Sequence, residues 1–215
     1  MQVGRIDIER LDAGRLDPVA GRILDAALQQ FTRSGLRRST VDDVARRAKV
    51  SRVTVYRRFG SKEGLVAFCL LRESRRFLAV LDAAVAELPS IEERVAEGFA
   101  VTLRHIRSHP LMGGLLRLEP DVVLPFLTVD GGPVLVAVRD HVAERLRREG
   151  VGGAGNGGAG GAGGAGGSEA AAVAELMVRV VVSFLLTPAS CIELDDADRA
   201  RDFARRFLVP LLRRH

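Results

Sequence analysis

The sequence predicts an all-α protein of about nine helices, and three observations lead to this expectation. Ala, Val, Leu and Arg are abundant among the 215 residues, whereas aromatic residues make up only 5%. In most segments apolar residues recur every three or four positions, as they do in an amphipathic helix. No region shows the succession of short apolar runs and turn residues that is typical of a β-protein.

The first two predicted helices have clear start and stop signals. Asp17 precedes Pro18, a pair typical of an N-cap and the first helical residue, and Gly35 stands where a C′ glycine ends a helix. Thr40 followed by Asp43 has the form of a capping box, which opens the second helix. We therefore expect one helix between Pro18 and Gly35 and a short one after Thr40.

Further helices follow, each between recognisable end signals. Ser51 is expected to cap a third, short helix, and Ser61 a fourth that runs towards Leu88. The later helices are expected from Pro89 to His109, from Pro133 to Glu149, from Ser168 to Leu186 and from Asp195 to Pro210, with only short helical pieces over 111–130.

Two segments are predicted to lack regular structure. Residues 1–17 mix charges of both signs and are expected to form a disordered arm, and residues 152–167 a flexible Gly/Ala loop. One register of that loop matches the G-x-G-x-x-G spacing of dinucleotide-binding loops. Such a loop requires a strand before it and a βαβ unit around it, and the sequence predicts neither. No cofactor is therefore expected.

Positive charge is concentrated near the N-terminus. The chain carries 32 Lys and Arg against 27 Asp and Glu, which gives a net charge of +5. Between Val19 and Val66 eleven basic residues stand against four acidic ones, so this segment contributes +7 and the rest of the chain sums to −2. This asymmetry is expected of a nucleic-acid-binding protein.

The basic segment contains a helix, a two-residue turn and a second helix over residues 40–59. In a helix-turn-helix the second helix lies in the major groove, and the N-terminus of the first lies on a phosphate. Val55 and Phe59 are four residues apart and are expected to hold the second helix on the core. The predicted DNA contacts are Thr40, Ser51, Arg52, Val53, Thr54, Tyr56, Arg57, Arg58 and Lys62.

These side chains suit different parts of a duplex. Arg52 is able to donate two hydrogen bonds to a guanine, and Val53 offers an apolar contact for a thymine methyl. The hydroxyl-bearing residues and Lys62 suit phosphate oxygens. Two alternatives stay open: Arg57 and Arg58 are equally well explained as solvated side chains, and the single tyrosine as core packing.

Residues 23–65 carry a dense series of motifs: T-V-x-x-V-A-x-x-A, then V-S-x-x-T-V-Y-R-x-F, then S-K-E-x-L. Over Ile23 to Leu65 the chain resembles the TetR family of bacterial transcriptional regulators. The resemblance covers about a fifth of the 215 residues. The family usually has glycine in the turn where this chain has Lys49, and a non-glycine residue at positive φ there costs about 1 kcal/mol.

The resemblance implies a two-part protein, with a helix-turn-helix DNA-binding head over 18–66 and a helical regulatory and dimerisation body over 67–215. Members of the family bind double-stranded DNA at palindromic operators as homodimers and usually repress transcription. The resemblance further implies that a small molecule enters the body, shifts the fourth helix and releases the DNA, and for this chain we expect a small apolar effector. The alternative is a constitutive dimeric regulator without a ligand response. An enzyme is not expected, because no catalytic set of Ser, His and Asp stands out.

Apolar positions of the body predict two further sets of residues. A ligand cavity is expected to be lined by Phe99, Leu103, Ile106, Leu115, Phe126, Leu127, Val138 and Phe184, although plain core packing also explains them. The last two helices are expected to pack with those of a partner as a four-helix bundle, because 170–186 is apolar nearly all round. That interface is predicted at Val180, Phe184, Ala200, Phe203, Ala204 and Phe207.

Other classes of site have weaker signals. His105 and His109 have a spacing compatible with a metal, but no third ligand is evident and no metal is expected. Two cysteines are too few for a disulfide framework. No segment reaches the length of a membrane span, and residues 1–17 lack the apolar core of a signal peptide. We therefore expect a cytoplasmic, nucleoid-associated protein.

Overall fold

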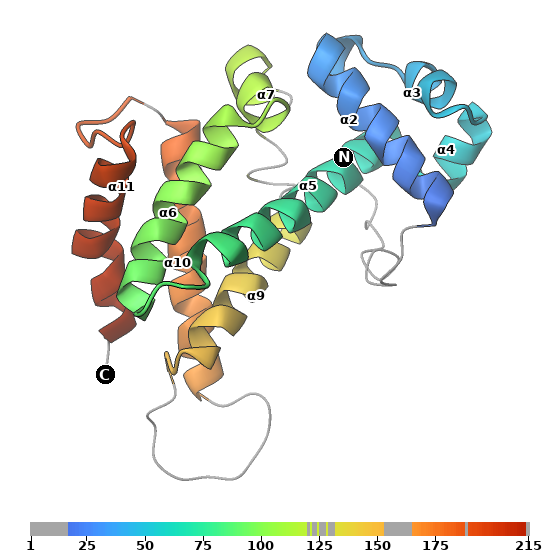
Figure 1. Ribbon diagram of the computed structural model, residues 1–215. Helices are drawn as coiled ribbons and strands as arrows, with labels where there is room; N and C mark the ends of the chain where they lie inside the picture. The colour runs from blue at the N-terminus through green and yellow to red at the C-terminus, as the bar shows by residue number, and fades with distance from the viewer. Residues whose placement is uncertain are drawn as a thin grey trace. The chain divides into compact units, whose positions relative to one another are not determined.

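The computed structural model describes residues 17–119, 121, 124, 128, 132–152, 165–187 and 189–213. In these residues all regular structure is helical: nine α-helices, then one π-helical and one 3-10 segment (Figure 1). The predicted all-α fold is therefore confirmed. The chain forms two compact units, Met1–Ser74 with Ser108–Val134, and Arg75–Arg107 with Leu135–His215.

The first unit is built around a three-helix group, drawn blue to cyan in Figure 1. Its elements are α2 (Pro18–Arg38), α3 (Val41–Ala48), α4 (Arg52–Phe59), the first part of α5 (Lys62–Val85), and α7 (Met112–Leu118). Asp17 caps α2 by accepting a 2.8 Å hydrogen bond from the backbone N–H of Val19. The helical backbone of α2 is interrupted at Gly35, whose φ of 77° is the left-handed value expected of a C′ glycine.

The core of this unit is apolar and joins all of its helices. Ile23, Leu24 and Phe31 of α2 are buried against Val44 of α3 and Val55 of α4. α3 and α4 have eight residues each, which is too short for a helix to be stable alone in water. Their stability therefore depends on this shared core and on the caps at their ends.

A buried arginine ties α5 to α2. The side chain of Arg72 is 9% exposed and lies 2.9 Å from the Asp25 carboxylate and 3.3 Å from the Glu73 carboxylate. Its Nη1 also donates to the backbone carbonyl of Gly21 at 3.3 Å. Because a buried charge is stable only when it is paired, these contacts fix α2 on α5.

The second unit consists of longer helices. It contains the rest of α5, α6 (Ile91–Ser108), α9 (Gly132–Arg148), α10 (Ala165–Leu186), α11 (Ala197–Phe203), the π-helical η1 (Ala204–Leu208) and the 3-10 segment η2 (Val209–Arg213). Figure 1 shows α6, α10 and α11 side by side. They share one apolar cluster, and α9 packs on the first half of α10 in another.

Ion pairs connect the helices of the second unit. The Asp82 carboxylate of α5 is 3.0 Å from His141 Nε2 and 2.5 Å from the Arg145 guanidinium, both on α9. Burial opposes ionisation of Asp82, but the hydrogen bonds from Arg145 and His141 outweigh it and lower the pKa of this carboxyl group. The Glu97 carboxylate of α6 likewise pairs with Arg201 of α11, which lowers the pKa of Glu97.

Three helix ends differ from the prediction. α5 ends at Val85 rather than near Leu88. α10 begins at Ala165, so Ser168 lies inside the helix instead of capping it; extending a formed helix through a glycine costs only about 1 kcal/mol. The final helix changes to η1 and then η2 because Pro210 has no N–H for the α-helical bond and its ring disturbs the preceding turn.

Some predictions fall outside the described residues. They are the arm over 1–16, the loop over 153–164, and the ligand-lining residues Phe126 and Leu127. The compact units also group the chain differently from a single boundary after residue 66, because α5 belongs to the first unit as far as Ser74 and 108–134 joins it. Within the described part of the chain, no helix combines the length and apolar character needed to cross a membrane.

Candidate DNA-binding surface

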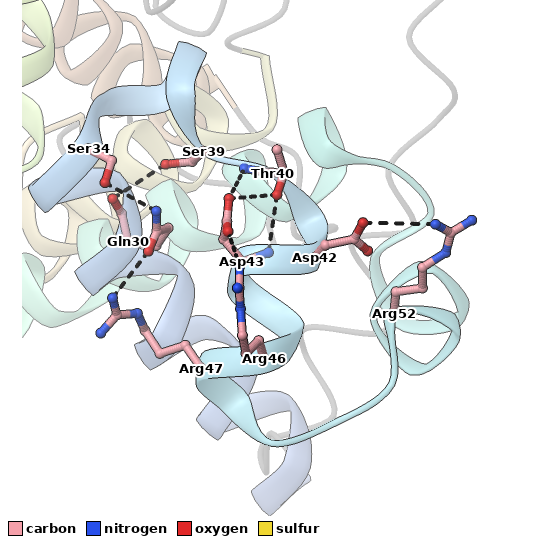
Figure 2. Close-up of polar contacts among 9 residues, drawn as sticks. All are labelled: Gln30, Ser34, Ser39, Thr40, Asp42, Asp43, Arg46, Arg47 and Arg52. Atoms are coloured by element: carbon pink, nitrogen blue, oxygen red, sulfur yellow. Dashed lines mark hydrogen bonds and ion pairs between the residues drawn. The ribbon is translucent and has the colours of Figure 1, made fainter.

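α3 begins with the predicted capping box (Figure 2). The Thr40 hydroxyl accepts a 3.1 Å hydrogen bond from the backbone N–H of Asp43, and the Asp43 carboxylate accepts one of 3.1 Å from the backbone N–H of Thr40. The bond from the Thr40 hydroxyl is the main reason why the pKa of Asp43 is lowered. The first turn of α3 is therefore fixed by its own side chains.

The turn between α3 and α4 is made by a lysine in a conformation that favours glycine. Lys49 has φ 55° and ψ 48°, and it is the one non-glycine residue at positive φ among those described. Its N–H and that of Val50 donate to carbonyls of the last turn of α3 at 3.2 and 3.0 Å. Ser51 then caps α4 by accepting a 3.2 Å bond from the N–H of Thr54. Both features are predicted from the sequence: a non-glycine residue at positive φ in the turn, and Ser51 as the cap of the next helix.

α4 has one buried and one exposed face. Val55 and Phe59 are buried in the core, as predicted, and Val55 is 1% exposed. Val53 by contrast is 68% exposed, and the Tyr56 ring is also exposed. Arginines 52 and 57 are exposed as well. The exposed face of α4 thus combines two arginines with an apolar and a hydroxyl-bearing side chain, the residue types that suit the base edges and phosphates of a duplex.

Arg52 lies close to a carboxylate that the sequence analysis did not single out. Its Nη1 is 3.9 Å from Asp42 Oδ2 at the start of α3, and both side chains are about two-thirds exposed, at 67% and 63% (Figure 2). An exposed pair at this distance contributes little to stability, so Arg52 is free to change partner. On α4 itself, the Thr54 hydroxyl is 2.9 Å from that of Ser51.

Two of the predicted DNA contacts are engaged within the first unit. Arg58 is mostly buried and pairs with the Asp17 carboxylate at 2.5 Å. Lys62 Nζ donates a 2.6 Å hydrogen bond to the backbone carbonyl of Leu36. Lys62 satisfies a carbonyl near the C-terminal end of α2, where a cation is favoured. Arg58 instead neutralises the carboxylate that caps the N-terminus of α2.

Two other arginines of α3 also have partners in the unit. Arg47 Nη2 donates to Gln30 Oε1 at 3.2 Å, and Gln30 in turn donates to the Ser34 hydroxyl at 3.1 Å (Figure 2). Arg46 pairs with Asp43 of its own helix. The Arg47 contact attaches α3 to α2, whereas the exposed Arg46 pairs only within α3. We take the exposed cations of α4 as the charged groups of the candidate surface.

Comparison with known proteins identifies the family. The family model described as "Bacterial regulatory proteins, tetR family" matches residues 23–68, which contain α3, α4 and the turn between them. Residues 23–68 belong to the TetR family. The motifs that predicted this membership therefore coincide with the capping box, the turn and the two faces of α4.

Individual TetR-type relatives match different lengths of the chain. An HTH-type transcriptional regulator of Mycobacterium tuberculosis is 34% identical over 102 residues, which is 47% of this chain and half the length of that relative. Another from the same organism, AlkX, is 27% identical over 82% of this chain and 76% of its own length. The crystal structure of the TetR family repressor AlkX from Dietzia sp. superposes with a TM-score of 0.67 at 24% identity, over 93% of this chain and all of that one.

The predicted ligand-lining residues whose side chains the structure describes fall into two groups. Phe99 and Leu103 are buried in the α6–α10–α11 cluster, and Phe184 packs against the same cluster. Ile106 and Val138 are half-buried. Leu115 lies on α7, and its side chain is outside the described part of the structure.

Two positions of the predicted dimer interface are buried within the single chain. Ala200 is 2% exposed and Ala204 is fully buried, and both pack inside the subunit with Ala96 and Phe99 of α6. Small residues allow two helices to approach closely, and here the second helix is α6 of the same chain rather than a partner. Phe207 by contrast is 51% exposed.

The two histidines with metal-compatible spacing have other contacts. His105 stacks on Phe77 with ring centroids 4.5 Å apart. His109 Nδ1 is 3.3 Å from the backbone N–H groups of Leu111 and Met112 and accepts from them at the start of α7. Its Nε2 faces the Glu73 carboxylate at 3.7 Å. No group of three metal-ligating side chains occurs in the residues that the structure describes.

Proposed function

We propose that this chain is a DNA-binding transcriptional regulator that reads a duplex with the exposed face of α4. The observation that carries the proposal is the exposure of Val53 and Tyr56 between Arg52 and Arg57, on the side opposite to the buried Val55. Arginine suits guanine and phosphate, valine a thymine methyl, and tyrosine a phosphate oxygen. With this function we also propose a location in the cytoplasm, at the nucleoid.

The N-terminus of α3 supplies a second contact in this proposal. Thr40 stands at a helix end whose backbone N–H groups favour an anion, and one short turn joins this helix to α4. Thr54 and Ser51 complete the polar rim of the surface. Arg58 and Lys62 are assigned to holding the unit together, because their charged groups already have partners there.

We also propose that the protein acts as a homodimer on a palindromic operator. The second half of α10 supports this, since its apolar residues from Val180 to Leu186 are only half-buried in the single chain. Phe207 and Leu176 leave about half of their surface in water. We assign the interface to Val180, Phe184, Phe203 and Phe207, and leave Ala200 and Ala204 to the subunit core.

We further propose that the regulator is a repressor released by a small apolar effector. Two AlkX proteins, one from Mycobacterium tuberculosis and one from Dietzia, match this chain over most of its length, and the latter is a repressor implicated in n-alkane biodegradation. An effector with a long hydrocarbon chain is therefore the first class to test. Titration of the protein–DNA complex with an n-alkane, a fatty alcohol and a fatty acid of equal length should release the DNA with one of them.

A constitutive regulator is the second candidate function. Phe99 and Leu103 are buried in a packed cluster with Ala96 and Ala100, as residues of an ordinary core are. If none of the three hydrocarbon classes changes DNA affinity, this second candidate is favoured and the body serves dimerisation alone.

Selection of genomic DNA fragments by the purified full-length protein tests the proposed function. The bound fragments should share an inverted repeat whose half-sites are centred about 10 base pairs apart, or a multiple of that spacing. Val53→Ser should change the preferred bases, whereas Arg46→Ala on the neighbouring helix is a matched control that should not. Absence of any shared sequence among the bound fragments would show that the chain is not a sequence-specific regulator.

A further inference from the structure

The last residues of α2, after its break at Gly35, are held by two charged side chains from distant parts of the first unit. Glu119, in the segment after α7, accepts hydrogen bonds from the N–H groups of Leu36 at 2.7 Å and Arg37 at 3.2 Å. Lys62, at the start of α5, donates to the carbonyl of Leu36 at 2.6 Å. Both backbone polar groups of Leu36 are thus bound by side chains of opposite charge. We call this arrangement of Glu119, Leu36 and Lys62 the Leu36 clamp.

The conformation of Gly35 makes the Leu36 clamp possible. With φ at 77° this residue turns the chain so that the N–H groups after it point away from the helix. A Cβ atom added to Gly35 would lie 2.4 Å from Glu119 Oε1, so the carboxylate occupies the space that a side chain would need. Gly35 is therefore required both for its backbone angle and for the approach of Glu119.

The residues after the clamp lead directly into the capping box. Ser39 is buried, and its hydroxyl donates a 2.6 Å bond to the carbonyl of Gly35. Thr40, the next residue, is the N-cap of α3. The path from Leu36 to Thr40 is therefore hydrogen-bonded at both ends, and a shift of Leu36 moves the start of α3.

We propose that Glu119 is a positioning residue for the DNA-binding surface. It sets the place of α3, and with it α4, from a segment 83 residues away in the sequence. Loss of the Glu119 contact frees the connection between α2 and α3 and weakens sequence-specific binding, although Glu119 itself does not touch DNA. This proposal rests on the proposed function, because operator affinity is its functional readout.

The two contacts of the Leu36 clamp come from different elements of the first unit. Lys62 belongs to α5, whereas Glu119 follows α7 in the chain. The clamp is thus the point at which these two elements hold the same residue.

The test compares Glu119→Ala and Glu119→Gln with Asp121→Asn in the full-length protein. Asp121 is the matched control, because it pairs with the exposed guanidinium of Arg37 and not with the backbone. Hydrogen exchange of the peptide over 35–40 and affinity for the selected fragment are measured, together with affinity for random DNA of equal length. Glu119→Ala should exchange faster and bind the selected fragment about tenfold more weakly, with a smaller loss on random DNA.

The other variants sharpen the result. Glu119→Gln keeps one acceptor oxygen and the shape of the side chain, so this variant should remain folded. Its exchange rate over 35–40 and its affinity for the selected fragment should lie between those of Glu119→Ala and the wild type. Asp121→Asn should change neither measurement. Faster exchange with unchanged affinity would overturn the proposal and leave Glu119 as a structural cap. Unchanged exchange would overturn it as well, because the contact would then not hold the chain in solution.

The outcome also separates this proposal from the proposed function. If the wild type selects no DNA sequence, the proposed function is wrong, and the positioning role falls with it even if the exchange of 35–40 responds to Glu119→Ala. If the wild type selects a sequence and Glu119→Ala binds it equally well, only the positioning role is wrong.

Discussion

The two units of the molecule differ in what fixes their helices. In the first unit α3 and α4 have eight residues each, and side-chain caps and charged contacts to the backbone set their positions. In the second, α6, α9 and α10 have 17 to 22 residues, and α10 is apolar on several sides. Caps and turns are local and are encoded in a few neighbouring residues. The inward face of a long apolar helix is decided instead by the helix that packs against it.

The largest expected effect comes from the buried side of the last helix. Ala204→Glu places a carboxylate at a fully buried position in the second unit, and it should destabilise the subunit by about 3–5 kcal/mol. Denaturant unfolding monitored by circular dichroism measures this loss. A variant that stays as stable as the wild type would show that residue 204 faces solvent or a partner.

Phe207→Glu is the matched change on the exposed side of the same segment. Because half of the Phe207 side chain is in water, the subunit should stay folded while the dimer dissociates. Sedimentation should then give a folded species near the 23.2 kDa mass of one chain. A Phe207→Glu protein that remains dimeric would place the interface elsewhere.

A smaller effect is expected on the DNA-binding face of the first unit. Arg52→Ala should reduce affinity for the preferred sequence by about 1–3 kcal/mol and relax base preference at one position of each half-site. Fluorescence anisotropy with duplexes varied at single positions measures both. An equal loss on preferred and random DNA would mean that Arg52 contacts only the backbone of the duplex.

Lys62→Ala distinguishes a contact to protein from a contact to phosphate. Because Lys62 is a member of the Leu36 clamp, Lys62→Ala should weaken DNA binding but leave the salt dependence of that binding unchanged. A phosphate contact would instead lower the slope of log K against log salt by about 0.9. Titrations at three salt concentrations separate the two roles.

The smallest effect is expected from pH in the second unit. The folded-state pKa of Asp82 is lowered, so the unfolded chain binds the proton more readily than the folded one. The stabilisation from Asp82 is therefore complete above the ordinary value of 3.8 and is lost as the pH falls through the folded-state pKa. When the pH is lowered below 3.8, the free energy of unfolding should therefore fall less for Asp82→Asn than for the wild type. The difference should be up to about 1 kcal/mol, because the group is partly exposed. Equal losses would contradict the pairing.

The same contrast explains how much the sequence predicts. The capping box of Thr40, the left-handed Lys49 and the inward-facing Val55 all follow from residues within one or two turns, and the structure has each of them. The TetR-type motif spans the same region. The elements of a helix-turn-helix surface are thus encoded locally.

Contacts over long sequence distances were not predictable in this way. Nothing near Glu119 indicates that its carboxylate binds Leu36, and Lys62 is expected on phosphate when only the motif is considered. Ala200 and Ala204 fit an interface between chains as well as a contact with α6, because the pattern of small residues is the same for both. Which of these two contacts a small residue makes depends on the helix that packs against it, and that helix can be distant in the sequence.

Binding of the selected duplex and a scrambled duplex of equal length tests the central claim most directly. The full-length protein is titrated with each at physiological salt, where non-specific electrostatic binding is weak. If the exposed face of α4 reads DNA sequence, the selected duplex should bind at least about a thousandfold more tightly, and Val53→Ser should reduce that ratio. Equal affinity for the two duplexes would contradict the account.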